Sequence, residues 1–394
     1  MSGAAGKALD GVSVLDVTQV MAGPFCAMQL CDMGADVIKV EPPEGDSTRR
    51  MAGARGSDSA SFNAVNRGKR GIVLNLKRPP AQEAFRRLAR RADVIIENYR
   101  PGVMRGFGLD YPALSTDHSA LIYASISGYG QTGPYAEKGG FDLVAQGVSG
   151  LMSITGEPGG APGTVGVPLT DLGAGLYALS AILAALYYRS RTGLGQYIDT
   201  SLVEAGVALS VWESAEYFAG GGIPQPMGSA HRMTAPYQAV RCADGFMTLA
   251  AANDRLFRRL SALLGHEEWT TNPDYADDTN RVRNRSALVA LIEAETMTRP
   301  RAHWVALFEA NGLPCGPIND YAQVFADPHI RARGMVVETE HPTLGHLQTL
   351  GSPVKMSATP PLTGRRAPLL GEHTREVLLD AGYSDEEIAA ITGT

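Results

Sequence analysis

Apolar residues in this chain form short runs that alternate with longer stretches of mixed character. The run GVSVLD begins at Gly11, and a turn of small residues and an apolar helical pattern lead from it to DVIKVE, which ends at Glu41. The same order of strand, helix and strand recurs at residues 72–77, 79–92 and 93–99, and a further strand is expected within 121–130. Short apolar strands that alternate with helices predict an α/β fold with a Rossmann-like, doubly wound parallel sheet.

The turns that follow the predicted strands are candidates for a binding site. In open parallel sheets, ligands bind beyond the carboxyl ends of the strands, where such turns meet. The segments expected along this edge are residues 18–23, 41–43, 77, 98–102 and 127–133.

Residues 164–190 contain the apolar helical pattern around which we expect the rest of the chain to be organised. Six apolar side chains recur at helical spacing, with glycine and alanine between them that let other backbones approach closely; they are Leu172, Leu176, Leu179, Ile182, Leu183 and Leu186. We therefore expect a buried helix. Thr170 or Asp171 can cap its start, because a side-chain oxygen there accepts from unpaired N–H groups. On these residues alone, Asp171 is either a helix cap or a reactive carboxylate.

The second half of the chain predicts a smaller unit of strands and helices. A strand and a helix are expected within residues 191–205, a hairpin that turns at Ala243-Asp244-Gly245, and amphipathic helices at 255–264, 286–296 and 301–310. The short charge run of Arg281, Arg283 and Arg285 is typical of a solvated face. We predict that residues 1–227 begin a large α/β domain, that residues 228–325 form a small α+β domain, and that residues 326–394 return to the large domain.

Composition narrows the class of protein. The 394 residues carry a net charge of −6 and are 19% charged, so the chain lacks the basic surplus that nucleic acid or an anionic membrane requires. The four cysteines form no close CxxC pair and no apolar signal segment precedes the first strand, which favours a cytoplasmic location. The weakly polar run 172–188 is shorter than the roughly 20 residues of a membrane span. We expect neither nucleic acid nor membrane as a partner.

Motifs for other chemistries are weak or missing. GYGQTG at residues 128–133 matches the GxGxxG dinucleotide pattern, but Pro134 follows at once, so no helix can begin where its N-terminus would bind the pyrophosphate. A nicotinamide or flavin oxidoreductase is therefore disfavoured. The sequence has no serine–histidine arrangement and no spacing of metal ligands, so we expect no metal.

A carboxylate at a helix start can instead act as a nucleophile towards an activated acyl group. The chain resembles the family III CoA-transferases, which include formyl-CoA transferase, carnitine CoA-transferase and the α-methylacyl-CoA racemase branch. The motifs that carry the resemblance are LDGVSVLDVTQVMAGP, ADVIKVEPPEGD, NRGKRGIVLNLK, ADVIIENYRPGV, SGYGQTGPYAEKGGFDLVAQGVSG, GVPLTDLGAGLYA, RTGLGQYIDTSL and RAPLLGEHT. The resemblance implies that Asp171 is the nucleophile, that an aspartyl-CoA thioester forms on it, and that the protein is a homodimer of interlocked rings.

The resemblance also implies a set of residues that contact coenzyme A. They are Val20, Met21, Ala22, Pro42, Leu74, Asn75, Lys77, Asn98, Tyr99, Arg100, Arg105, Lys138, Gly139, Gly140, Phe141 and Asp142. CoA carries phosphates, so the basic side chains in this set are suitable charge partners. Pro42 and Gly106 stand where formyl-CoA transferase has arginines, which indicates that the adenosine end is held differently here.

Three functions remain open within this resemblance. The chain looks most like the succinyl-CoA-dependent dicarboxylate (glutarate-type) CoA-transferases, in which His231 or Arg232 would pair with the distal carboxylate of a diacid. A racemase needs a histidine and a supporting glutamate to move a proton, but Phe141 and Asn253 stand at those positions. The remaining alternative is a non-catalytic acyl-CoA-binding protein.

Overall fold

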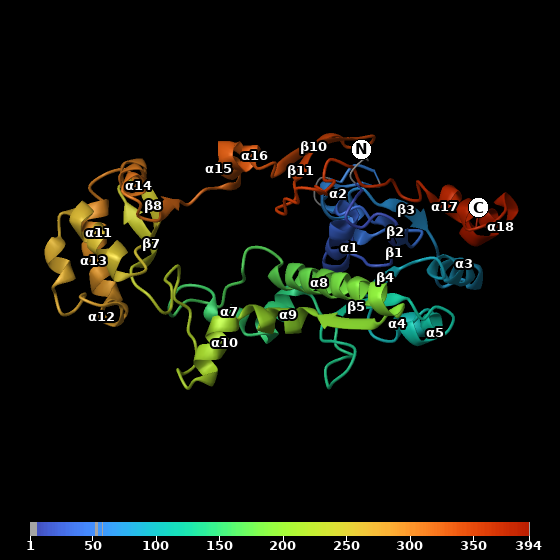
Figure 1. Ribbon diagram of the computed structural model, residues 1–394, viewed down its shortest axis with the longest axis horizontal. Helices are drawn as coiled ribbons and strands as arrows, with labels where there is room; N and C mark the ends of the chain where they lie inside the picture. The colour runs from blue at the N-terminus through green and yellow to red at the C-terminus, as the bar shows by residue number, and fades with distance from the viewer. Residues whose placement is uncertain (1–5, 52–53, 57, 394) are drawn as a thin grey trace. The chain divides into compact units, whose positions relative to one another are not determined.

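The computed structural model describes residues 6–51, 54–56 and 58–393 (Figure 1). Contacts within the chain divide it into two units. The first contains Met1–Leu151, Val165–Gly221 and Pro328–Thr394, and the second contains Met152–Thr164 and Gly222–Asp327. The domain limits at residues 227 and 325 remain predictions.

The first unit is built on a six-stranded sheet in which every strand pair is parallel. Its strands, in spatial order, are β3 (Arg70–Val73), β2 (Asp36–Glu41), β1 (Ser13–Asp16), β4 (Val94–Glu97), β5 (Ile122–Ser127) and β6 (Tyr197–Ser201). The connections reverse direction at β1, which is the strand order of the doubly wound dinucleotide-binding fold. The predicted parallel α/β sheet is confirmed.

One predicted strand is shorter than expected. β3 ends at Val73, whereas the apolar pattern predicted a strand over residues 72–77. The N–H of Leu74 still donates to the carbonyl of Glu41 at 2.9 Å. The chain then turns, with the N–H of Lys77 donating to Asn75 Oδ1 at 3.2 Å. The local side-chain bond of Asn75 therefore competes with the sheet and ends the strand.

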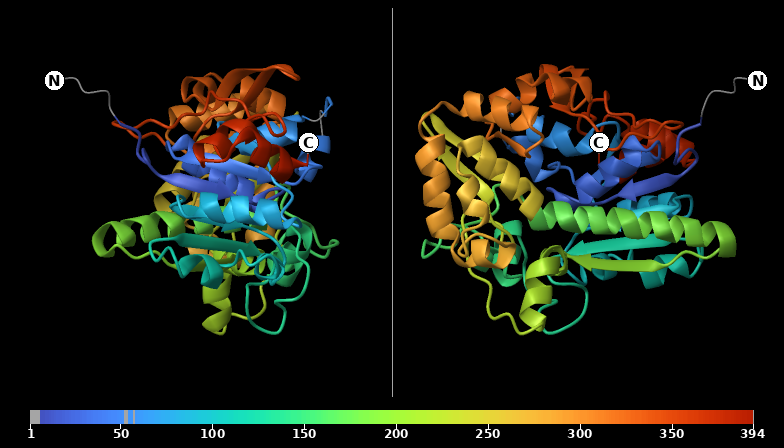
Figure 2. Two further views of the ribbon diagram at one scale, coloured as in Figure 1. Left: turned by 90° about the vertical axis from the view of Figure 1, so that its right-hand side faces the viewer. Right: turned by 60° about the vertical axis from the view of Figure 1, so that its left-hand side comes forward.

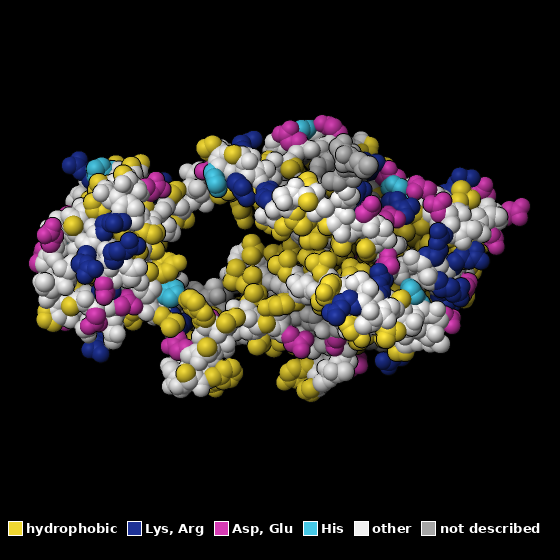
Figure 3. Space-filling model, viewed as in Figure 1, with side chains coloured by type: hydrophobic (Ala, Val, Ile, Leu, Met, Phe, Trp, Pro, Cys, Tyr) yellow, Lys and Arg dark blue, Asp and Glu magenta, His cyan; other side chains and the backbone are white. Residues whose placement is uncertain are grey.

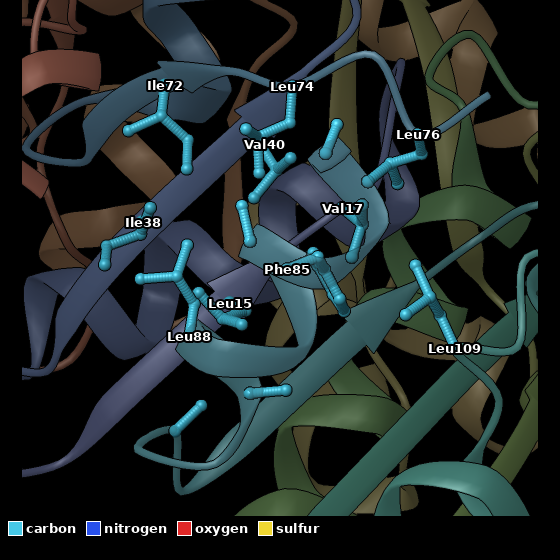
Figure 4. Close-up of a cluster of buried hydrophobic side chains, with 14 of the residues drawn as sticks. Leu15, Val17, Ile38, Val40, Ile72, Leu74, Leu76, Phe85, Leu88 and Leu109 are labelled. Carbon is cyan, nitrogen blue, oxygen red and sulfur yellow. The ribbon is translucent and has the colours of Figure 1, made fainter. Parts of the chain in front are cut away.

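Alternate residues of each strand enter separate cores on the two faces of the sheet. Leu15 and Ile38 pack with Phe85 and Leu88 of α3 (Pro79–Ala89) in one cluster (Figure 4). The helices α17 (Thr374–Asp380) and α18 (Asp385–Thr392) contribute to the same cluster, so the end of the chain lies near β3 and α3 (Figure 1).

The opposite face is covered by α1 (Ala22–Asp32) and α8 (Leu169–Thr192). Val14 and Val37 pack there with buried side chains of both helices, and α8 runs alongside the strands in the right-hand view of Figure 2. The predicted face of α8 was only partly right. Its buried side is formed largely by small residues, such as Gly173, Ala174 and Ala178, whereas Leu176 is 49% exposed.

α8 is also longer than the apolar run predicted. It has 24 residues and by length and composition alone could cross a membrane, a test that the core helix of a soluble protein also passes. Its packing against α1 and the sheet accounts for its apolar composition.

The first unit contains further short elements. Helices in it are α2 (Ala60–Asn66), α4 (Val103–Gly106), α5 (Tyr111–Ser115), α6 (Asp142–Val148), α9 (Leu202–Leu209), α10 (Val211–Phe218), α16 (Pro328–Ala332) and the 3₁₀ turn η1 (Ser47–Arg50). The hairpin of β10 (Val336–His341) and β11 (Gly345–Leu350) also belongs to it. The short helix α7 (Leu151–Ile154) lies where the chain passes into the second unit.

The second unit is a small α+β structure with its own core. β7 (Tyr237–Cys242), β8 (Gly245–Ala250) and β9 (Cys315–Pro317) form an antiparallel sheet. Its helices are α11 (Asp254–Leu264), α12 (Asp278–Arg283), α13 (Arg285–Thr296), α14 (Arg301–Ala310), α15 (Tyr321–Ala326) and the turn η2 (Glu267–Thr270). The predicted hairpin turn and the three predicted helices are confirmed.

In the arginine run of the second unit, Arg283 is exposed as predicted for a solvated face, but Arg281 and Arg285 are not. Arg281 is fully buried, and its guanidinium pairs with Asp254 at 2.7 Å. It also donates to the carbonyl of Ala235 at 2.9 Å. Arg285 donates to the carbonyl of His231 at 2.6 Å. Through these hydrogen bonds, the two arginines fix the segment that leads into β7.

Candidate functional site

A cavity of about 290 Å³ lies at the carboxyl ends of the first unit's strands. Segments that follow β1 and β4 line it together with the end of β5, at the edge where parallel sheets bind ligands. The lining residues are Gln19, Val20, Met21, Ala22, Asn98, Tyr99, Arg100, Pro101, Ile126, Ser127, Gly128, Lys138, Gly139, Gly140, Phe141, Asp171 and Leu202. Asp171 and most of the predicted CoA residues are thus brought together.

Asp171 lies in the first turn of α8 but does not cap it. The N-cap position is Pro168, and no side chain of α8 caps the helix. Among the described residues, no hydrogen bond or ion pair reaches the Asp171 carboxylate. Both predicted local caps, Thr170 and Asp171, are therefore wrong.

The helix is capped instead by Asp142, the first residue of α6. Asp142 Oδ1 accepts from the N–H of Thr170 at 2.8 Å and from Thr170 Oγ1 at 2.7 Å. It lies 3.4 Å from the N–H of Asp171. Asp142 does not appear among the residues that line the cavity, although the resemblance implied a CoA contact for it.

Two effects raise the pKa of Asp171. Burial raises it most, because an ionised carboxylate loses hydration, and the nearby negative charge of Asp142 adds to the rise. Together they move the pKa from 3.8 to about 7. Asp171 is therefore more basic than an ordinary aspartate.

The turn opposite Asp171 is held by side chains from other segments. Val20 has a φ of +71°, a strained value for a β-branched residue. Asn98 fixes the preceding residue, because it accepts from the N–H of Gln19 at 2.8 Å and donates to its carbonyl at 2.7 Å. The N–H of Val20 faces the carboxylate of Asp46 at 3.3 Å, and Lys39 donates to the carbonyl of Thr18.

Buried ion pairs stabilise the turn around Val20. Lys39, Lys69 and Asp16 are fully buried, with Lys69 Nζ 2.7 Å from Asp16 and Lys39 Nζ 3.1 Å from Asp46. Burial by itself would lower the pKa of Lys39, but the charges of Asp16 and Asp46 outweigh it and hold the pKa above its usual value. The sequence analysis missed this cluster. Its signal was a lysine inside the apolar strand DVIKVE.

Close glycine contacts shape the other walls of the cavity. A Cβ atom on Gly140 would lie 2.5 Å from the Cα of Gly128, so the two backbones touch and close the loop between them. A Cβ atom on Gly175 of α8 would lie 2.7 Å from the carbonyl oxygen of Ala22. This approach brings the start of α8, and Asp171 with it, against the start of α1.

A second cavity, of about 260 Å³, gathers the remaining predicted residues near β3. Pro42, Leu74, Asn75 and Lys77 line it, together with Phe107. Gln19 and Tyr99 line both cavities, so the two are neighbours.

Arg105 lies in a third cavity, of about 330 Å³, which shares Arg100 with the first. The side chain of Arg105 is 81% exposed, and its Nε lies 3.4 Å from Oδ2 of Asp110. Glu97 forms the buried floor of this cavity, and burial raises its pKa to about 7.

The two predicted acid-binding residues belong to the second unit. The His231 ring stacks on Tyr237 at 4.9 Å, and Arg232 donates to the carbonyl of Gln225 at 2.9 Å. Neither residue lines any of the three cavities described above. Asn253, the position of the racemase glutamate, caps α11 by accepting from the N–H of Leu256 at 3.0 Å.

The sequence of residues 9–374 matches the model of CoA-transferase family III. The chain belongs to this family. Among curated proteins, it is 42% identical over 380 residues to the succinate–glutarate CoA-transferase of Agrobacterium fabrum, which covers 94% of this chain and 95% of that protein. It is 40% identical over 388 residues to the human succinyl-CoA:glutarate CoA-transferase, covering 98% of this chain and 89% of that protein.

Family III members from other organisms extend this likeness. The succinyl-CoA:mesaconate CoA-transferase of Haloarcula marismortui is 40% identical over 385 residues, or 95% of this chain and 96% of that protein. The crystal structure of a CAIB/BAIF family protein from Brucella suis superposes with a TM-score of 0.85 at 40% identity, covering 95% of this chain and all of that chain. The chain is therefore a family III CoA-transferase, an enzyme that acts on CoA thioesters.

Proposed function

We propose that this protein transfers CoA from succinyl-CoA to a small dicarboxylic acid through a covalent thioester on Asp171. The observation that carries the proposal is the position of Asp171, a carboxylate with a raised pKa and no ion pair to the described residues, in a cavity at the carboxyl ends of the strands. The relatives are named for transfer to glutarate or mesaconate, which supports a dicarboxylic acid as the acceptor.

The first half-reaction forms the thioester. An oxygen of Asp171 attacks the thioester carbonyl of succinyl-CoA, and the CoA thiolate leaves, which produces a mixed anhydride. The thiolate then attacks the Asp171 carbonyl, so that the aspartyl-CoA thioester forms and succinate leaves with one oxygen from Asp171.

The second half-reaction returns the enzyme to its starting state. The acceptor carboxylate attacks the aspartyl thioester and displaces the thiolate, forming a new mixed anhydride. Attack of the thiolate on the acceptor carbonyl yields the new acyl-CoA and leaves one acceptor oxygen on Asp171. Each carboxylate attacks in its ionised form, so neither half-reaction requires a proton donor.

Basic residues around the cavities are suited to the phosphates of CoA. Arg100 and Lys138 line the first cavity, Lys77 the second and Arg105 the third. Charge-assisted hydrogen bonds from these groups to phosphate are stronger than bonds between neutral groups. His231 and Arg232 remain the proposed partners of the acceptor's distal carboxylate.

We expect hydroxylamine to trap the thioester on the peptide that contains Asp171. Incubation with succinyl-CoA, followed by mass spectrometry, should show the hydroxamate on this peptide in the wild type and not in Asp171→Ala. Asp385→Asn is a matched control, because Asp385 also lies in the first turn of a helix but is exposed. CoA transfer without any modification of Asp171 would contradict the covalent mechanism.

The racemase alternative makes a different prediction. Phe141 is 74% exposed at the cavity and carries no ionisable group, and Asn253 is used as a helix cap. We therefore expect exchange of the α-proton of 2-methylacyl-CoA with deuterated solvent to be negligible. Exchange at a rate comparable with CoA transfer would favour the racemase.

A further inference from the structure

Asp142 joins three segments at the start of α8. Besides its bonds to Thr170, it accepts from Gln146 Nε2 at 2.7 Å through its second oxygen. Gln146 in turn accepts from the N–H of Val165 at 3.0 Å. The side chain thus connects α6, the loop before α8 and the first turn of α8.

The position of Asp142 couples this connection to the chemistry of Asp171. Its Oδ1 is 3.4 Å from the N–H of Asp171, so a fixed negative charge lies beside the proposed nucleophile. A like charge close to a partly buried carboxylate disfavours the ionised form of that carboxylate. The raised pKa of Asp171 reflects this charge in addition to burial.

Other charged groups also lie near Asp171. Arg100 and Lys138 line the same cavity, and their positive charges would lower the pKa of Asp171, yet it is raised. On α9, Glu204 bonds to Ser201 instead, and the first turn of α1 carries no acidic residue. Asp142 is therefore the carboxylate that acts on Asp171.

We propose that Asp142 is a positioning residue of the transfer reaction: it caps the first turn of α8 and, as a fixed negative charge, favours acylated Asp171 over the free carboxylate. The proposal rests on the proposed function of Asp171. In the mixed anhydride and the thioester, Asp171 carries no charge, so its repulsion from Asp142 is relieved when either forms. Asp142 thereby makes Asp171 a stronger nucleophile and stabilises the covalent states relative to the free enzyme.

The test compares Asp142→Asn and Asp142→Glu with the wild type in the full-length enzyme. We would measure kcat and KM for succinyl-CoA with glutarate between about pH 5 and 9. In Asp142→Asn, the acidic limb of kcat/KM should move about one unit to lower pH, because a like charge is removed. At pH 8, kcat should fall about 10- to 100-fold, as expected for loss of charge-assisted bonds, with little change in KM. Asp142→Glu should restore the limb.

A second variant separates the charge from the cap. Thr170→Val removes the hydroxyl bond to Asp142 but keeps the negative charge, so the acidic limb should stay where it is in the wild type. A limb that moves equally in Thr170→Val and Asp142→Asn would show that the shift comes from disturbed structure, which would overturn the proposed role of the charge.

Other outcomes for the KM and the pH profile of Asp142→Asn would also overturn the proposal. A raised KM for succinyl-CoA with an unchanged pH profile in Asp142→Asn would make Asp142 a CoA contact instead. If Asp142→Asn does not fold, the pH profile of the wild type still tests the proposal. An acidic limb of kcat/KM below about pH 5 would match an ordinary aspartate and would contradict any effect of Asp142 on Asp171. Failure of the proposed function would look different from failure of this inference, because the wild type would then yield no trapped thioester.

Discussion

At the scale of the residue, Asp171 combines reactivity with a cost in stability. Its pKa rises on folding from 3.8 to about 7, so the folded state binds more protons than the unfolded state between these values. Stability from this group therefore falls as the pH rises from about 4 to about 7. The proposed reaction gives a reason to retain this partly buried carboxylate, which forms no ion pair with the described residues.

This cost predicts how Asp171→Asn behaves. Asn does not titrate, so the variant should gain stability relative to the wild type as the pH rises from about 4 to about 8, by about 1–3 kcal/mol after allowance for partial exposure. Urea unfolding at several pH values measures the difference. A constant difference across this range would show that the pKa of Asp171 is not raised.

The buried lysine of β2 has the opposite effect on stability. Lys39→Met would leave the carboxylate of Asp46 without its ammonium partner and remove the donor to the Thr18 carbonyl. We expect the free energy of unfolding to fall by about 3–5 kcal/mol, because a buried charge is left unpaired. In Arg375→Met, which breaks an exposed ion pair with Asp385, the urea midpoint should hardly change. Equal effects of the two substitutions would contradict the role of burial.

At the scale of the element, the close approach of α8 to α1 positions Asp171. Gly175 lies one turn after Asp171 and leaves no room for a Cβ atom beside the carbonyl of Ala22. On the same helix, a Cβ atom on Gly173 would lie 3.2 Å from the end of the flexible Leu209 side chain. These two glycines therefore differ in what a methyl group would meet.

This difference gives a matched pair of variants. Gly175→Ala should destabilise the protein by about 1–3 kcal/mol through overpacking against backbone. It should also lower kcat, because the first turn of α8 must shift. Gly173→Ala should be close to neutral, since the higher helix propensity of alanine, about 1 kcal/mol, offsets the crowding. Thermal unfolding and transfer assays measure both effects, and equal losses in the two variants would contradict this account.

At the scale of the whole molecule, large apolar side chains are exposed on three neighbouring helices of the first unit. They lie on α8, α9 and α10 and include Leu176, Tyr177, Val207, Val211, Tyr217 and Phe218. Apolar side chains gather over the region of α8 in the view of Figure 3. Patches of this kind mark interaction sites, so we propose that they are covered in the homodimer that the family resemblance implies.

The proposed homodimer predicts the effect of a charge in this surface. Phe218, which is 83% exposed, would be buried on association, so Phe218→Asp should weaken the dimer and increase the fraction of monomer at low concentration. Light scattering after size-exclusion chromatography measures the mass. Leu379→Asp on α17 is the control and should not change it. A wild type that is monomeric at micromolar concentration would contradict the dimer.

Much of the architecture follows from patterns close together in the sequence. The strands at Val14 and Val94 and three helices of the second unit (α11, α13 and α14) were predicted correctly, because apolar periodicity and turn residues act over a few positions. The family also follows from sequence, since its motifs extend along nearly the whole chain. The predicted edge of the sheet does carry the cavity that contains Asp171.

The sequence by itself thus determined the order of strands and helices, the family and the candidate nucleophile. Tertiary structure alone decided that Asp142, 29 positions before Asp171, caps α8, that Lys39 is neutralised by buried carboxylates, and that Arg281 is buried. The physical reason is that periodicity is set by neighbours along the chain. Burial, charge state and helix capping depend instead on which distant segments the fold brings into contact.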